Sequence, residues 1–205
     1  VVASKYGIVV IADEIYEDMV FDGNKYFPMA GLNQESLERK VSILTCSGLA
    51  KRFLVPGWRF GWIAMHEAEE GHLSQIRKGL FDLSTLIIGS CTLIQAALSE
   101  IFENTPEIFF QNTNELLQAN ARYLCRELAE IEGLHVIEPQ GTLYMLIGVD
   151  YTSFKGFTND VELSEQLLVQ DSISVLPASV NTLRLNDFRV LFCIFRFLAF
   201  QDTLG

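Results

Sequence analysis

The chain has 205 residues, a hydrophobic content of 49% and a formal net charge of -11. This length fits one domain plus a substantial part of a second, and the apolar content supports a folded core and argues against disorder. The acidic residues are spread along the chain and no concentrated basic face is evident, which argues against a nucleic-acid partner. The apolar runs are too short or too interrupted to cross a bilayer, so we expect no membrane partner either.

The first part of the chain contains three short apolar runs, at residues 8–12, 41–45 and 60–65. Continuous runs of this length, rich in β-branched residues, are typical of strands buried on both faces of a parallel sheet. The connection between the second and third runs contains the turn-forming pairs Ser47-Gly48 and Pro56-Gly57.

After residue 70 the apolar spacing becomes helical. Thr105-Pro106-Glu107 is typical of a helix start, and the amphipathic pattern that follows predicts a long helix ending near Gly133. The remaining predicted elements are helices over residues 73–83, 93–101 and 161–168 and strands over 134–137, 143–147, 173–176 and 188–194.

The fold class that follows is α/β. We expect residues 1–105 to form the C-terminal part of a large domain with a mostly parallel sheet. Residues 106–205 should form a small α+β domain that includes the long connecting helix. The residues after Ile194 follow no regular pattern.

Two polar residues follow the first predicted strand. Asp13 lies at the carboxyl end of this strand, where open α/β sheets bind ligands, and Tyr16 could reach the same side. Each residue alone has a commoner explanation, a turn or helix cap for Asp13 and packing for Tyr16.

The segment after the second predicted strand combines an amine with phosphate-binding groups. Lys51 could form a Schiff base in a partly desolvated pocket, and Arg59 could hold a phosphate with its planar guanidinium. Ser47 and the backbone N–H groups of the glycine turn could add further donors. Together these residues predict a pocket for a phosphorylated aldehyde.

Two motifs, Ala12-Asp13-Glu14-Ile15-Tyr16 and the segment from Ser47 to Trp62, resemble the fold-type I pyridoxal-phosphate (PLP) aminotransferases. Within that family the chain is most similar to the tyrosine aminotransferases, and it resembles the C-terminal part of their sequences. The resemblance runs from residue 1 to about residue 194 and includes segments 141–144, 159–162 and 175–177.

The resemblance implies PLP as the cofactor and assigns residues to it. Lys51 would form the Schiff base and move the proton between the substrate Cα and cofactor C4′. Asp13 would pair with the pyridine nitrogen, Tyr16 with the phenolic oxygen, and Arg59 with the phosphate.

Two further residues take roles from the resemblance. Arg189 matches the family's arginine that holds the substrate carboxylate by two parallel hydrogen bonds. Many relatives carry a phosphate-binding serine three residues before the lysine, a position that is Gly48 here, and Ser47 lies one residue earlier. Ser47 is the chain's candidate for the phosphate, and its position departs from the family's spacing by one residue. No metal ligand set is expected, because the cysteines and histidines are scattered.

The implied activity is transfer of the amino group of an aromatic amino acid, tyrosine first, to 2-oxoglutarate, as part of tyrosine catabolism. Alanine or kynurenine aminotransferase, the lyase that makes aminocyclopropane carboxylate, and an inactive fragment with a binding role remain open alternatives. The implied partners are amino-acid and 2-oxo-acid substrates and, at full length, a second copy in a homodimer. A cytoplasmic location is expected, with a mitochondrial one left open.

The resemblance also implies that family members carry further cofactor contacts upstream of residue 1. These are an aromatic ring that stacks on the cofactor and additional phosphate donors. We therefore expect residues 1–205 alone not to catalyse efficient transamination.

Overall fold

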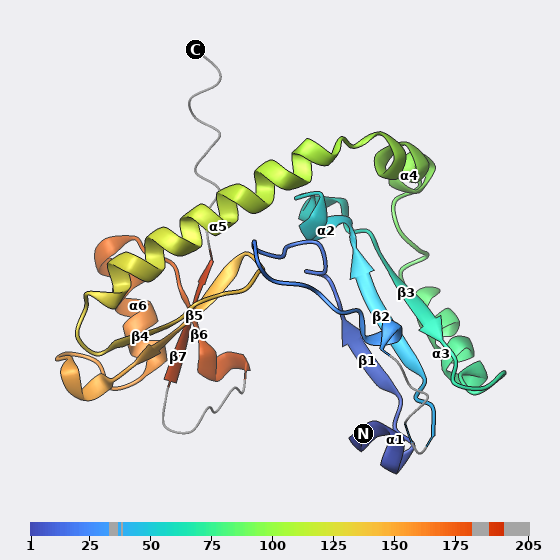
Figure 1. Cartoon of the computed structure of the whole chain (residues 1–205), viewed down its shortest axis with the longest axis horizontal. Helices are drawn as coiled ribbons and strands as arrows, with labels where there is room; N and C mark the ends of the chain where they lie inside the picture. The colour runs from blue at the N-terminus through green and yellow to red at the C-terminus, as the bar shows by residue number, and fades with distance from the viewer. Residues whose placement is uncertain (33–36, 38, 182–188, 195–205) are drawn as a thin grey trace. The chain divides into compact units, whose positions relative to one another are not determined.

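The computed structural model describes residues 1–32, 37, 39–181 and 189–194 (Figure 1). The chain divides into two compact units, Val1–Gln111 and Asn112–Gly205. The division falls within the long helix α5 (Glu107–Ala129). The assignment of these units to a large and a small domain stays a prediction.

The first unit contains a three-stranded sheet in the order β1-β2-β3. Its strands are β1 (Val10–Asp13), β2 (Ile43–Gly48) and β3 (Gly61–His66). β1 and β2 are parallel, with Asp13 opposite Cys46 at their carboxyl ends. Since parallel strands end at the same edge of a sheet, Asp13 and the residues after Gly48 emerge at one edge.

β3 corrects the sequence interpretation, because it runs antiparallel to β2. Parallel neighbours need a long crossover, usually a full helix, whereas antiparallel neighbours need only a local reversal. Here the chain reverses through one helical turn, α2 (Leu49–Arg52), and the 3₁₀ turn η2 (Pro56–Trp58). The sheet is therefore mixed, not mostly parallel, over the residues that the structure describes.

Burial also differs from the expectation of strands covered on both faces. Of the three strands of this sheet, only β2, the central one, is largely buried along its length. β1 alternates between half-buried and exposed positions, and Ile11 is 71% exposed. Among the described residues, β1 and β3 form the two edges of this sheet, and each has a strand neighbour on one side only.

Helices of the first unit pack through aromatic side chains. The ring of Phe53, which follows α2, meets Phe102 and Phe110 edge to face at 5.5 and 5.4 Å, and Phe102 also meets Trp62 at 5.9 Å. Such pairs add to the stabilisation from apolar burial. The helical elements of this unit besides α2, η2 and α5 are α1 (Val2–Tyr6), η1 (Met29–Gly31), α3 (Ser74–Ser84) and α4 (Thr92–Asn104).

The second unit contains a four-stranded antiparallel sheet in the order β4-β5-β7-β6. In α5, Leu117 and Ala121 are buried, and in β5 Met145 and Val149 are buried. The strands are β4 (Leu134–Ile137), β5 (Tyr144–Val149), β6 (Leu176–Pro177) and β7 (Arg189–Ile194), and the helical elements after α5 are η3 (Tyr151–Ser153), α6 (Asp160–Asp171) and η4 (Ala178–Asn181).

The start of α6 shows how local sequence fixes an element. The side chain of Asn159 accepts a hydrogen bond from the N–H of Glu162 at 3.0 Å. The carboxylate of Glu162 accepts from the N–H of Thr158, the residue before the N-cap, at 2.7 Å, a reciprocal contact similar to a capping box. The bond to Asn159 satisfies one of the N–H groups that a helix start leaves without an intrahelical partner.

The predicted elements are confirmed in kind and order within the described residues, with one shortened strand. The strand expected over residues 173–176 is reduced to Leu176–Pro177. The long helix ends at Ala129, a few residues before Gly133, which has a φ of 89°. Among the described residues, no helix is long and apolar enough to cross a membrane.

A core substitution next to Lys51 should destabilise the first unit. Leu49 is fully buried, whereas Leu86 is 78% exposed. Leu49→Ala should lower the free energy of unfolding by about 2–5 kcal/mol, because it removes buried methyl groups and leaves a cavity. Leu86→Ala should change it by less than about 0.5 kcal/mol. Urea unfolding followed by circular dichroism measures both, and equal effects would contradict the packing described for α2.

Candidate active site

Lys51 lies on α2, the single helical turn that directly follows β2 (Figure 1). The turn is anchored by buried Leu49, whose N–H donates to the Phe60 carbonyl at 3.1 Å. Gly48 is required here, because a Cβ at this position would lie 2.7 Å from the Phe60 oxygen and 3.0 Å from the Cα of Gly61. The backbone that carries Lys51 is therefore held against β3.

Tyr16 links Lys51 to Asp13. The Lys51 Nζ lies 5.5 Å from the centroid of the Tyr16 ring. Burial raises the pKa of the Tyr16 hydroxyl, and the negative charge of Asp13 raises it further. Asp13 is exposed at the end of β1, where its Oδ1 accepts a hydrogen bond from the N–H of Ile15 at 3.4 Å. The structure thus brings an amine, a phenol and a carboxylate to one edge of the sheet.

Arg59 follows η2 and has a left-handed backbone conformation, with φ of 51°. Its Nη1 donates to the carbonyl of Pro56 at 3.0 Å, and the residue is exposed. This bond uses one of the five N–H donors of the guanidinium, a group whose planar fork suits phosphate oxygens.

Ser47 has a partner that the sequence did not predict. Its Oγ donates a hydrogen bond to Oε1 of Glu17 at 3.1 Å. Burial raises the pKa of Glu17, the charges of Asp18 and Glu14 raise it further, and the bond from Ser47 opposes these effects. The role of Ser47 as a phosphate ligand stays a prediction.

Arg52, the residue after Lys51, also has a defined environment. Its Nη1 lies 3.2 Å from Oδ2 of Asp18, and its guanidinium carbon lies 4.8 Å from the centroid of Phe110 and 5.5 Å from that of Phe53. The ion pair is partly exposed, so its contribution to stability is small. Sequence patterns gave no role to Glu17 or Asp18, because their partners lie about 30 residues away and only the fold shows the contact.

The predicted substrate arginine, Arg189, belongs to the second unit. Its backbone lies opposite Val149 in the pairing of β5 with β7. Its side chain is outside the described part of the structure, so its role toward the substrate carboxylate stays a prediction.

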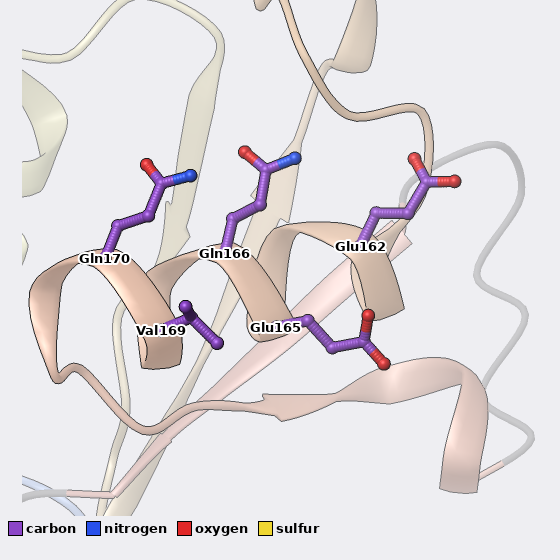
Figure 2. A pocket seen from close by; sticks show the side chains of 5 residues that line it. All are labelled: Glu162, Glu165, Gln166, Val169 and Gln170. Atoms are coloured by element: carbon purple, nitrogen blue, oxygen red, sulfur yellow. The ribbon is translucent and has the colours of Figure 1, made fainter.

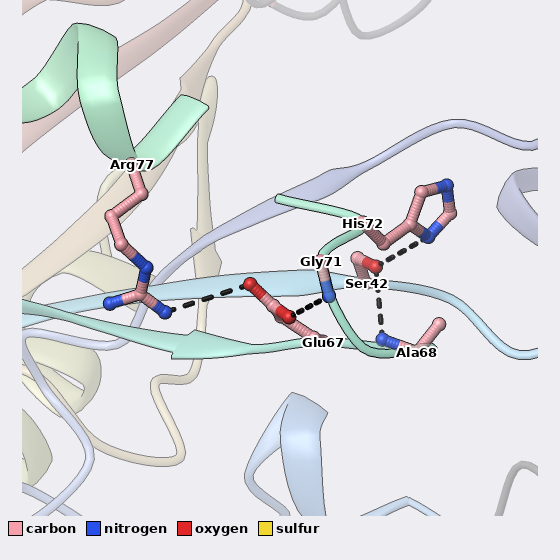
Figure 3. Close-up of polar contacts among 6 residues, drawn as sticks. All are labelled: Ser42, Glu67, Ala68, Gly71, His72 and Arg77. Carbon is pink, nitrogen blue, oxygen red and sulfur yellow. Dashed lines mark hydrogen bonds and ion pairs between the residues drawn. The ribbon is translucent and has the colours of Figure 1, made fainter. Parts of the chain in front are cut away.

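In the first unit, a polar cluster stabilises the end of the three-stranded sheet that lies opposite to the Lys51 end (Figure 3). Oγ of Ser42 accepts a hydrogen bond from the N–H of Ala68 at 3.0 Å and lies 3.1 Å from Nδ1 of His72. Glu67 accepts from the N–H of Gly71 at 2.8 Å and pairs with Arg77 at 3.6 Å. These contacts fasten the turn between β3 and α3, which explains His72 as a structural residue.

The second unit has a shallow groove of about 250 Å³ along α6 (Figure 2). Its lining is acidic, amide or aliphatic and contains none of the predicted site residues: Glu162, Glu165, Gln166, Val169 and Gln170. Within the described residues, no group of three His, Cys, Asp or Glu side chains is placed to hold a metal ion.

Residues 1–194 match the model of the family "Aminotransferase class I and II". The chain belongs to this family. It is 44% identical over 193 residues to tyrosine aminotransferase of Bos taurus and 42% identical to that of Mus musculus, in each case over 94% of this chain. The chain spans 42% and 41% of the lengths of these relatives.

Solved structures show the same fold. Tyrosine aminotransferase from Leishmania infantum superposes with a TM-score of 0.82 at 24% identity, covering 94% of this chain and 45% of that one. Alanine aminotransferase from Pyrococcus furiosus gives 0.80 at 23% identity, covering 95% and 46%. The cofactor of the family is pyridoxal phosphate, and a putative aminotransferase from Clostridium difficile 630, with a TM-score of 0.72 at 20% identity over 95% of this chain and 47% of that one, is PLP-bound.

Removing the charge of Asp13 should lower the pKa of Tyr16. In Asp13→Asn the pKa of the Tyr16 hydroxyl should fall toward its ordinary value without reaching it, because burial is the larger cause of its elevation. Asp22→Asn, an exposed change outside this group, should leave it unmoved. NMR titration of protein labelled at tyrosine Cζ, with the Tyr16 signal assigned from Tyr16→Phe, measures both. An unchanged Tyr16 pKa in Asp13→Asn would contradict the electrostatic interaction between Asp13 and Tyr16.

Proposed function

We propose that the chain is part of a PLP-dependent aminotransferase that transfers the amino group of an aromatic amino acid, tyrosine first, to 2-oxoglutarate. Lys51 would hold the cofactor as a Schiff base. The observation that carries this proposal is the gathering of Lys51, Tyr16 and Asp13 at one edge of the sheet, in a chain of this family.

The chemistry of these side chains fits the cofactor. PLP, when bound, supplies an electron-withdrawing ring that stabilises negative charge at the substrate Cα. The carboxylate of Asp13 would keep a proton on the pyridine nitrogen, and the hydroxyl of Tyr16, whose raised pKa keeps it protonated, would donate to the phenolic oxygen. Arg59 would bind the phosphate.

Lys51 would both hold the cofactor and move the proton between substrate Cα and cofactor C4′. Lysine suits this work when its neighbours restrict it, because a positioned base contributes more to rate than a freely moving one. The contact with the Tyr16 ring and the anchored backbone of α2 restrict Lys51 in this way.

Arg189 would select the substrate class. A guanidinium can hold an α-carboxylate by two parallel hydrogen bonds, which also orients the Cα–H bond for loss. This contact is common to amino-acid and 2-oxo-acid substrates, so it does not distinguish tyrosine from alanine. The proposal of tyrosine rests on the names of the relatives, which are tyrosine aminotransferases at 42–44% identity.

We propose a homodimer for the protein at its natural length, in the cytoplasm.

Lys51 should be the site of covalent attachment. In the protein at its natural length, PLP followed by borohydride should leave a stable adduct on the peptide that contains Lys51, as read by mass spectrometry. Lys51→Ala should abolish the adduct, and Lys40→Ala, at an exposed lysine of the same unit, should not. An adduct on another lysine would refute the assignment.

Arg189→Ala should lower kcat/KM for tyrosine by an amount that corresponds to about 2–5 kcal/mol of transition-state stabilisation, because a charged contact is lost. Arg189→Lys should recover part of this loss, since an ammonium group cannot reproduce the two parallel bonds. Steady-state kinetics of the two variants tests the role, and an unchanged kcat/KM in Arg189→Ala would exclude substrate binding.

A further inference from the structure

The hydroxyl of Ser47 is committed to a carboxylate. Its Oγ donates to Oε1 of Glu17 at 3.1 Å. A serine hydroxyl carries one proton, so it cannot donate to a second acceptor at the same time. The oxygens of an ionised phosphate are acceptors, and Ser47 in this arrangement would offer them lone pairs only.

The surroundings of Ser47 are also unfavourable to an anion. Glu17 is half-buried beside Glu14 and Asp18; burial raises its pKa, the charges of both neighbours raise it further, and the positive charge of Arg52 lowers it. The carboxylate of Glu14 is buried and accepts a hydrogen bond from the N–H of Met29 at 2.7 Å. A phosphate at the Ser47 hydroxyl would therefore lie against acidic side chains, and like charges repel strongly where water is partly excluded.

The turn that follows β1 contacts the segment around Lys51 through three consecutive residues. Tyr16 lies under the Lys51 Nζ, Glu17 accepts from Ser47, and Asp18 pairs with Arg52. Ser47 precedes Lys51 and Arg52 follows it, so the two polar contacts flank the lysine along the chain.

We propose that Ser47 and Glu17 are positioning residues, whose hydrogen bond fixes the turn that carries Lys51, and that Ser47 does not bind the cofactor phosphate. This inference rests on the proposed function of Lys51 and replaces the phosphate role expected for Ser47 from the sequence. Arg59 remains the phosphate ligand of this segment.

Comparing PLP with pyridoxal, which lacks the phosphate, separates the two roles. Each would be titrated into the protein at its natural length, and its attachment to Lys51 followed by absorbance. Arg59→Ala, the control for phosphate binding, should weaken PLP by at least tenfold and leave pyridoxal within about twofold. Ser47→Ala should weaken both by the same factor, about fivefold, the size expected for one lost hydrogen bond.

The partner of Ser47 is tested by a double-mutant cycle. Glu17→Ala should weaken the binding of PLP and pyridoxal by the same factor as Ser47→Ala. The double variant should bind both aldehydes only slightly more weakly than either single variant, because the two changes remove the same contact. Glu17→Gln keeps an acceptor oxygen and should remain within about twofold of the parent protein.

The pKa of Glu17, measured without cofactor, provides a second test. Ser47→Ala should raise the pKa of Glu17 in an NMR titration, because the donated bond that favours the charged carboxylate is removed. An unchanged pKa of Glu17 would overturn the inference, as would a Ser47→Ala variant that weakens PLP and spares pyridoxal, or affects neither. If neither aldehyde attached to Lys51 in the parent protein, the proposed function itself would fail, whatever the pKa of Glu17.

Discussion

The pairing of Gly48 with Gly61 is the constraint on which the site depends. The two backbones approach so closely that a Cβ at Gly48 would meet the carbonyl of Phe60, and this contact ends β2 and begins α2 at a fixed place. Because β1 lies parallel to β2 on its other side, Asp13 ends at the same edge of the sheet. Backbone hydrogen bonds thereby place the strand end that carries Asp13 at the same edge as the turn that carries Lys51.

Polar and charged contacts then join the turn after β1 to the segment around Lys51. The turn after β1 is acidic, and three consecutive side chains of this turn make contacts: Tyr16 with Lys51, Glu17 with Ser47 and Asp18 with Arg52. Lys51 thus lies over a phenol ring of this turn, and Arg52 pairs with one of its carboxylates. This arrangement orients Lys51 before any ligand arrives, which is the condition under which a positioned group contributes most to rate.

The sequence predicted the elements well because their signals are local. The apolar run of β2 and the proline at the start of α5 each act within a few residues. The direction of β3 could not be read in this way, since an apolar run carries no information on which way the strand returns. The motif identified Lys51, Asp13 and Tyr16, but the bond from Ser47 to Glu17 joins distant segments and needed the fold.

A crystal structure of the protein at its natural length with PLP would test the account most directly. The account predicts Lys51 joined to the cofactor, the Asp13 carboxylate within hydrogen-bonding distance of the pyridine nitrogen and the Tyr16 hydroxyl at the phenolic oxygen. The Ser47 hydroxyl should still meet Glu17. A cofactor bound away from the edge shared by β1 and β2, or attached to a lysine other than Lys51, would contradict it.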